Sequence, residues 1–180
     1  MKKQLRDETL KQLRTMSPQA YEERSQTLIN HLLQHPRMQQ ASVIAVTMSA
    51  FPEVNTKPLI EALWQQKKRV AIPKCEPKTH TMRFYEIESF EALEQTYSHL
   101  YEPNPAIHTY VPPEALDIIV VPGVVYNKDG YRIGFGGGYY DRYLPKTRAY
   151  RISMAFREQL QESIPFEAHD CTVHTLIVEP

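Results

Sequence analysis

The residues best suited to chemistry lie in one short segment. All six glycines of the 180-residue chain fall between residues 123 and 138. Glycine lets the backbone approach a ligand closely, and successive exposed N–H groups can form a nest for phosphate oxygens. Arg132 and Arg142 flank the last four glycines and could make bidentate contacts with an anion, while Asp141 is a hard oxygen ligand suited to Mg²⁺ on a polyphosphate. The segment therefore predicts a phosphate site.

The segment does not match two familiar glycine loops. A P-loop needs Gly-Lys followed by Ser or Thr, whereas Tyr139 and Tyr140 follow Gly138 here. A dinucleotide fingerprint that began at Gly134 would need Gly or Ala at position 139. A glycine-rich turn that only joins two elements is the alternative that this pattern leaves open.

The surrounding elements predict an α/β fold. Apolar β-branched runs alternate with segments of helical periodicity, which is typical of a mostly parallel sheet covered on both faces. Helices are expected in residues 2–34, with a break at Ser17-Pro18 and an end at Pro36, and in residues 56–68. Strands are expected at 43–48, 70–72, 82–87, 117–121, 150–155 and 172–178, with the first of them central. We expect a single domain over residues 1–180, a three-layer α/β/α fold in which the proline-rich segment 101–113 is a surface loop.

Composition narrows the class of protein. The 21 Lys and Arg residues balance 21 Asp and Glu residues, which argues against nucleic acid or an anionic membrane as the main partner. The longest aliphatic run, residues 118–121, stops at Pro122, and the charged N-terminus lacks the apolar stretch of a signal peptide. The two cysteines form no paired motif. We expect a cytoplasmic protein with small-molecule ligands, and a monomer by default.

The glycine segment also carries a resemblance. The run from Arg132 to Asp141, preceded by Val121-Pro122-Gly123, resembles the signature of the 5-formyltetrahydrofolate cyclo-ligases, also called 5,10-methenyltetrahydrofolate synthetases. The likeness covers essentially the whole chain: a basic N-terminal helix, an acidic residue after the first strand, and an aspartate near the C-terminus. It implies conversion of 5-formyltetrahydrofolate to 5,10-methenyltetrahydrofolate with ATP and Mg²⁺, releasing ADP and phosphate.

The resemblance also implies roles for individual residues. Catalysis would involve Arg132, Tyr139 and Asp141, and Mg²⁺ would sit on Asp141 and Asp170. ATP would contact Lys2, Lys3, Arg6, Arg132, Ile133, Gly134, Phe135, Gly136, Gly137, Gly138, Tyr139 and Tyr140. The folate substrate would contact Met48, Glu53, Phe135, Gly136, Gly137, Gly138 and Tyr139. Some family members carry basic residues inside the glycine loop where this chain has Phe135 and Gly137, so Arg132 and the N-terminal cations would have to supply the positive charge.

Ordinary explanations exist for the same residues. Lys2 and Arg6 could form a solvated helix stripe, Glu53 could cap a helix, and Asp141 could be an acid favoured by a helix dipole. Two other functions also remain: a sugar-phosphate isomerase, and a non-catalytic folate- or nucleotide-binding module. The combination of Asp141, Asp170 and the N-terminal cations favours the ATP-dependent enzyme, because an isomerase does not need a metal-nucleotide site.

Overall fold

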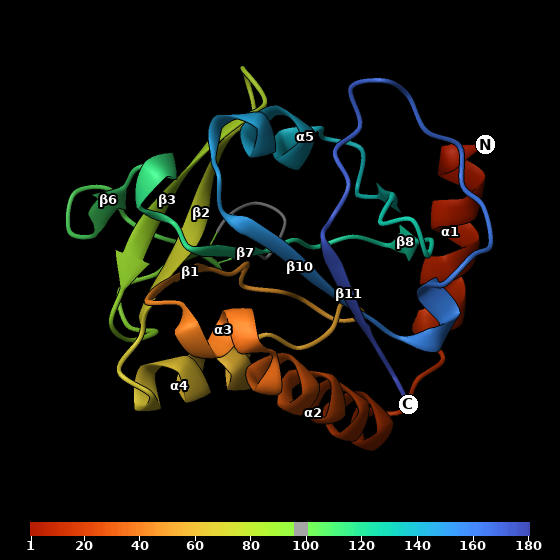
Figure 1. Ribbon diagram of the computed structural model, residues 1–180, viewed down its shortest axis with the longest axis horizontal. Coiled ribbons are helices and arrows are strands. Elements are labelled where there is room, and N and C mark those ends of the chain that lie inside the picture. The colour runs from red at the N-terminus through yellow and green to blue at the C-terminus, as the bar shows by residue number, and fades with distance from the viewer. Residues whose placement is uncertain (96–100) are drawn as a thin grey trace.

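A sheet of seven strands forms the centre of the computed structural model, which describes residues 1–95 and 101–180 (Figure 1). The strand order is β11-β10-β7-β1-β2-β3-β6. Neighbouring strands from β11 to β2 run parallel, whereas β3 pairs antiparallel with both β2 and β6. The strands are β1 (Val43–Ala45), β2 (Arg69–Glu76), β3 (Thr81–Ile87), β6 (Thr109–Val111), β7 (Ile118–Val120), β10 (Tyr150–Ala155) and β11 (Thr175–Val178). The predicted α/β fold with a mostly parallel sheet and a central first strand is confirmed.

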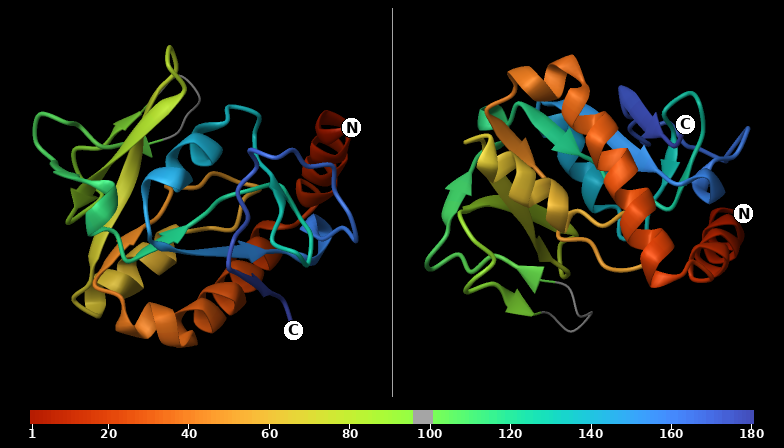
Figure 2. Two further views of the ribbon diagram at one scale, coloured as in Figure 1. Left: turned by 45° about the horizontal axis from the view of Figure 1, so that its top comes forward. Right: turned by 90° about the horizontal axis from the view of Figure 1, so that it is seen from below.

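Three helices cover one face of this sheet: α2 (Pro18–Gln34), α3 (Pro36–Gln40) and α4 (Lys57–Gln65) (Figure 2). The Ser17 hydroxyl accepts the Ala20 amide at the start of α2, and Pro18 follows it at the first helical position, as the sequence predicts. The apolar stripes of α2 and α4 pack against alternate residues of the strands, and each fully buried Leu or Ile contributes roughly 1.5–3 kcal/mol. The largest hydrophobic cluster includes Leu28, Ile29, Leu32, Leu59, Ile60, Leu63, Ile44, Val70 and Ile152.

Short segments cover the opposite face. A second hydrophobic cluster there packs α5 (Tyr139–Tyr143) and the 3₁₀ turn η2 (Leu144–Lys146) on the other side chains of β1, β2 and β7, close to η1 (Pro113–Ala115). The first helix, α1 (Lys2–Leu13), lies beside the sheet, against the hairpin of β8 (Val125–Tyr126) and β9 (Arg132–Ile133) and against η3 (Arg157–Gln159) (Figures 1 and 2). No helix in residues 1–95 or 101–180 is long and apolar enough to cross a bilayer.

Parts of the sequence-based prediction need correction. Segment 101–113 is not only a loop, because it contains β6 and also β5 (Tyr101–Glu102), which pairs with β4 (Glu94–Gln95). In β6 only Val111 is buried, so a three-residue edge strand leaves too little alternation to recognise. Pro36 does not simply end a helix. The second helix stops at Gln34, and Pro36 occupies the first position of α3. The β8–β9 hairpin was also not predicted.

Candidate functional site

The glycine loop runs from the end of β9 to the first turn of α5. Gly136 and Gly138 have φ values of 99° and 73°, in the left-handed region that side chains rarely adopt. Gly138 is the N-cap residue of α5, so the helix opens where the sequence predicts. Glycine at these two positions allows a tight turn that leaves the backbone close to the surface.

A cavity of about 380 Å³ lies against this loop. The glycines 136–138 line it together with Asp141 and Arg142. His80, from the turn between β2 and β3, and His169, from the C-terminal segment, also line it. Three segments that are far apart in the sequence therefore meet at the loop. The volume is within the range of small-molecule sites.

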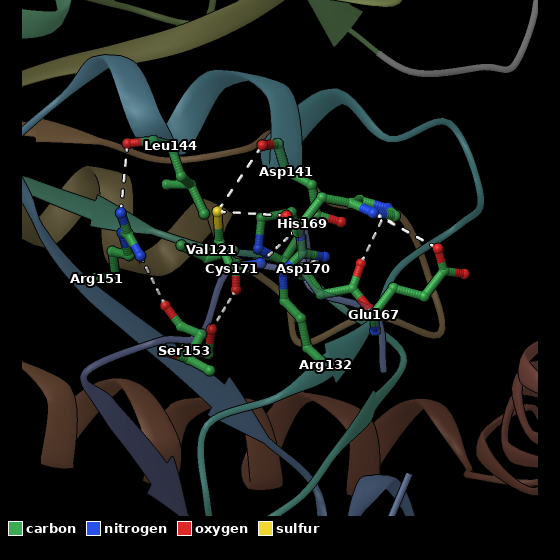
Figure 3. A network of polar contacts seen from close by, with 12 residues as sticks. Val121, Arg132, Asp141, Leu144, Arg151, Ser153, Glu167, His169, Asp170 and Cys171 are labelled. Carbon is green, nitrogen blue, oxygen red and sulfur yellow. Dashed lines mark hydrogen bonds and ion pairs between the residues drawn. The ribbon is translucent and has the colours of Figure 1, made fainter. Parts of the chain in front are cut away.

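Arg132 and Asp141 face each other beside the cavity (Figure 3). The Arg132 side chain is only 6% exposed, and its Nη1 donates to the Pro122 carbonyl over 3.0 Å. Its Nη2 lies 3.8 Å from Asp141 Oδ1, which also accepts the Cys171 amide over 3.1 Å. Arg132 Nε is buried and has no hydrogen-bond partner among the described residues. A buried guanidinium nitrogen without a partner is rare and fits a site completed by an anion.

The N-terminal helix contacts the same region through two cations. Lys2 Nζ lies 2.8 Å from Asp170 Oδ2, and Arg6 Nε donates to the Gly134 carbonyl over 2.7 Å. Burial alone would raise the pKa of Asp170, but the hydrogen bonds from Lys2 and the Glu167 amide hold that pKa below its usual value. The Asp170 carboxylate is therefore charged at neutral pH. The neighbouring residue Lys3 is exposed, and its side chain makes no hydrogen bond or ion pair within the described residues.

Glu53 lies in a second, smaller cavity of about 30 Å³, enough for about one water molecule. This cavity opens at the carboxyl ends of β1 and β7, where Thr47, Val120 and Gly123 line it. Glu53 Oε2 accepts the Ala50 amide over 3.2 Å. Burial raises the pKa of Glu53 to about 7. Met48 is half-buried and packs against the helix-side cluster.

Two side chains contact residues that line the cavities. The Tyr140 hydroxyl lies 2.7 Å from Thr47 Oγ1, and the Arg132 guanidinium stands over the Tyr140 ring at 5.5 Å. Burial raises the pKa of Tyr140 above its usual value, so its hydroxyl is neutral. Arg132 therefore contacts one residue of each cavity, Pro122 of the small one and Asp141 of the large one. Tyr140 contacts Thr47 of the small one.

Asp141 and Asp170 are the candidate metal ligands. They meet at Cys171, whose amide binds Asp141 and whose preceding residue is Asp170 (Figure 3). Among the described residues no three His, Cys, Asp or Glu side chains form a group that could hold a metal ion alone. Mg²⁺ is usually bound by one or two carboxylates together with water and substrate phosphates. The two aspartates are carboxylates of the kind that Mg²⁺ uses together with a polyphosphate.

The structure brings most of the predicted site residues together. Five of them are connected through the glycine loop and the C-terminal segment: Lys2, Arg6, Arg132, Asp141 and Asp170. Ile133 is buried in a hydrophobic cluster, so only its backbone can face a ligand. Sequence reasoning missed His80, because a single histidine in a turn carries no motif.

Comparisons with known proteins identify the family of the chain. A sequence model of the 5-formyltetrahydrofolate cyclo-ligase family matches residues 1–179. The 5-formyltetrahydrofolate cyclo-ligase of Haemophilus influenzae is 30% identical, covering 98% of this chain and 97% of the relative, and the mouse enzyme of that name is 30% identical over 99% and 93%. The solved structure of the Aquifex aeolicus 5,10-methenyltetrahydrofolate synthetase superimposes with a TM-score of 0.85 at 29% identity, covering 98% of this chain and 89% of that one. The chain therefore belongs to the 5-formyltetrahydrofolate cyclo-ligase family.

Proposed function

We propose that the protein converts 5-formyltetrahydrofolate to 5,10-methenyltetrahydrofolate in an ATP- and Mg²⁺-dependent reaction that releases ADP and phosphate. The observation that carries this proposal is the cavity of about 380 Å³ at the glycine loop, with the unpartnered Nε of Arg132 and the Asp141 carboxylate beside it. Loop amides and a guanidinium suit a triphosphate, and membership of the family supplies the substrate class.

The chemistry requires activation of a formamide. Its carbon is a poor electrophile and its oxygen a poor leaving group, so N10 cannot close the ring unaided. In the proposed reaction the formyl oxygen attacks the γ-phosphorus and the bond to the β-phosphate oxygen breaks, which releases ADP. N10 then adds to the carbon of the phosphorylated imidate and loses its proton. Phosphate departs with the former formyl oxygen, leaving the methenyl bridge.

The protein's part is positioning and neutralisation of charge, as in other phosphoryl transfers. Arg132 balances negative charge on the phosphates, and the amides of the loop bind their oxygens. Asp141 and Asp170 hold Mg²⁺, which when bound neutralises phosphate charge and orients the oxygens. Lys2, Lys3 and Arg6 contribute to ATP binding, and Tyr139 and Phe135 offer ring surfaces to the ligands. No covalent nucleophile is needed.

Glu53 and Met48 are assigned to the folate side. The Glu53 carboxyl would accept hydrogen bonds from the pterin ring, and Met48 would supply apolar contact. Arg132 contacts Pro122, which lines the small cavity, and Asp141, which lines the large one, and this supports the proposal that the formyl group lies near Arg132, between the folate and the phosphates. We further propose that residues 1–180 act as one domain, as a cytoplasmic monomer that works on small molecules. The central seven-stranded sheet and the family match over residues 1–179 support the one-domain part.

The test is a direct assay. Purified protein is mixed with 5-formyltetrahydrofolate, ATP and Mg²⁺, and the absorbance of the methenyl product is followed. Product should form only with all three components, and addition of EDTA should stop it. The Arg132→Gln variant, which keeps a hydrogen-bonding side chain without the charge, should be much slower. Absence of product from fresh substrate would overturn the proposal, and product formed without ATP would overturn its ATP-dependent part.

A further inference from the structure

The turn between β2 and β3 touches the glycine loop at one backbone atom. His80 Nδ1 lies 2.8 Å from the carbonyl oxygen of Gly137. A carbonyl oxygen can only accept, so Nδ1 must carry the hydrogen. The His80 ring lies 5.6 Å from the Tyr139 ring, and Arg142 Nη1 contacts the Thr79 carbonyl at 3.4 Å. The turn and the loop are therefore joined at three points around the large cavity.

The backbone of His80 is in an unusual conformation for a side chain of this size. Its φ is 55°, in the left-handed region that few residues other than glycine adopt, although asparagine, aspartate and histidine are found there more often than others. Glycine at this position would relieve the backbone but could not reach Gly137. A strained residue persists where the surrounding structure holds it, and such residues gather at functional sites. The contact with the loop is the feature that distinguishes His80 from a relaxed turn residue.

The bond to the Gly137 carbonyl fixes a peptide plane. In a planar trans peptide the carbonyl of residue 137 and the N–H of residue 138 point in opposite directions. A carbonyl held toward the β2–β3 turn therefore directs the Gly138 N–H away from it. Both flanking glycines have positive φ, so little else in the local chain restrains this plane. Arg6 makes the equivalent bond at the other end of the loop, to the Gly134 carbonyl.

We propose that His80 is a positioning residue that holds the 137–138 peptide so that its N–H is available to phosphate oxygens in the cavity of about 380 Å³. The loop is then clamped by a carbonyl bond at each end, one from α1 and one from the β2–β3 turn. The inference rests on the proposed function only in taking ATP as the ligand. It assigns His80 no contact with the reacting atoms.

Two substitutions at one position test this role. In His80→Asn the side-chain Nδ2 takes the place of the imidazole Nδ1, and asparagine tolerates the left-handed region. In His80→Gly the backbone is relaxed and the bond is lost. We expect His80→Gly to raise the KM for ATP roughly fivefold, as for the loss of one hydrogen bond, with an unchanged KM for the folate. His80→Asn should restore the KM for ATP to within about twofold of the wild-type value.

A matched control is Lys67→Gly. Lys67 is an exposed non-glycine residue with φ of 63°, between α4 and β2, so its substitution relaxes the backbone without touching the loop. It should leave both KM values unchanged. An unchanged KM for ATP in His80→Gly would overturn the inference, as would an equal rise in both KM values or a failure of His80→Asn to restore binding. A wild-type protein that forms no methenyl product would instead contradict the proposed function. The dissociation constants for ATP of the same variants, measured by calorimetry, would then decide the role of His80.

Discussion

The two cavities of this protein differ in size and in how they are built. The cavity at the glycine loop has about 380 Å³ and is walled by three segments that meet through single polar contacts. The cavity beside Glu53 has about 30 Å³ and is enclosed by packed strand ends such as Val120 and Val121. The first can receive a ligand as it stands, whereas the second holds no more than about a water molecule. Binding of a ring-sized ligand at Glu53 therefore requires the chain to move there. Binding of a ligand at the glycine loop requires no such movement.

The sharpest test of the large cavity is Asp141→Asn. The amide oxygen can still accept the Cys171 amide, so the local fold should persist while the negative charge is lost. We expect kcat to fall by roughly 100-fold or more, since removal of one preorganised charged contact typically costs this much. Steady-state kinetics at several Mg²⁺ concentrations measures the effect. Asp129→Asn, at an exposed position in the β8–β9 turn, is the control and should be active. Near-normal turnover of Asp141→Asn at low Mg²⁺ would contradict a metal role.

Substitutions at two glycines should distinguish an effect on packing from an effect on ligand binding. A Cβ at Gly130 would lie within 2.5 Å of the Val173 carbonyl, and the φ of this glycine is 87°, so Gly130→Ala should destabilise the fold by about 2–3 kcal/mol. A Cβ at Gly136 would meet only Arg6, at 3.6 Å, so Gly136→Ala should cost about 1 kcal/mol and act mainly on ATP binding. Chemical denaturation gives the first quantity and the KM for ATP the second. Equal losses of stability would show that both glycines serve packing alone.

Glu53, which lines the small cavity, should make the free energy of unfolding depend on pH. Burial raises the pKa of Glu53 to about 7 in the folded protein, above its ordinary value, so the folded state favours the neutral acid. This group costs no stability at low pH, where it is protonated in both states, and the folded protein loses stability as pH rises from about 4.5 to 7. Glu53→Gln should remove this loss and be more stable than wild type by about 2 kcal/mol at pH 8, with little difference at pH 4. Unfolding free energies at the two pH values measure it. A difference that does not grow with pH would show that Glu53 is not held neutral.

The smallest effect concerns the two adjacent lysines of α1. Lys2 pairs with the Asp170 carboxylate, which is 7% exposed, while Lys3 is exposed without such a partner among the described residues. Lys2→Ala should raise the KM for ATP about threefold and lower stability by up to about 1 kcal/mol, the range of a partly exposed ion pair. Lys3→Ala should leave stability unchanged and raise the KM for ATP less than Lys2→Ala does. Equal effects of the two substitutions on the KM for ATP would remove the distinction between them.

Much of the fold followed from local patterns. The break at Ser17-Pro18 could be predicted because the capping residue and the first helical residue are adjacent in the sequence. The buried strands could be predicted from their β-branched runs. The short strand β6 was not, because its pairing with β3 depends on residues 84–86, more than twenty positions earlier in the chain. Residue spacing also could not predict the order of the strands in the sheet.

The candidate site also has features that the local sequence predicts and features that it does not. The glycine cluster predicted a loop that opens a helix, because positive φ requires glycine at particular positions. Glu53 was expected to share a pocket with Met48, but Glu53 lines the small cavity while Met48 packs against the helix-side cluster and is not among the residues that line that cavity. The contact of His80 with Gly137 joins residues 57 positions apart. This contact depends on how the β2–β3 hairpin packs, so the spacing of the two residues in the sequence does not predict it.

The ion pair between Lys2 and Asp170 spans 168 positions, so it joins the first turn of α1 to the C-terminal segment whose Cys171 amide binds Asp141. While the chain is being synthesised, the first helix leaves the ribosome long before its counterion exists. This ion pair can therefore form only after residue 170 has left the ribosome. A fusion partner attached to the amino terminus would lie beside the Lys2–Asp170 ion pair, whereas one attached to residue 180 would lie next to α2, where Arg24 pairs with Glu179.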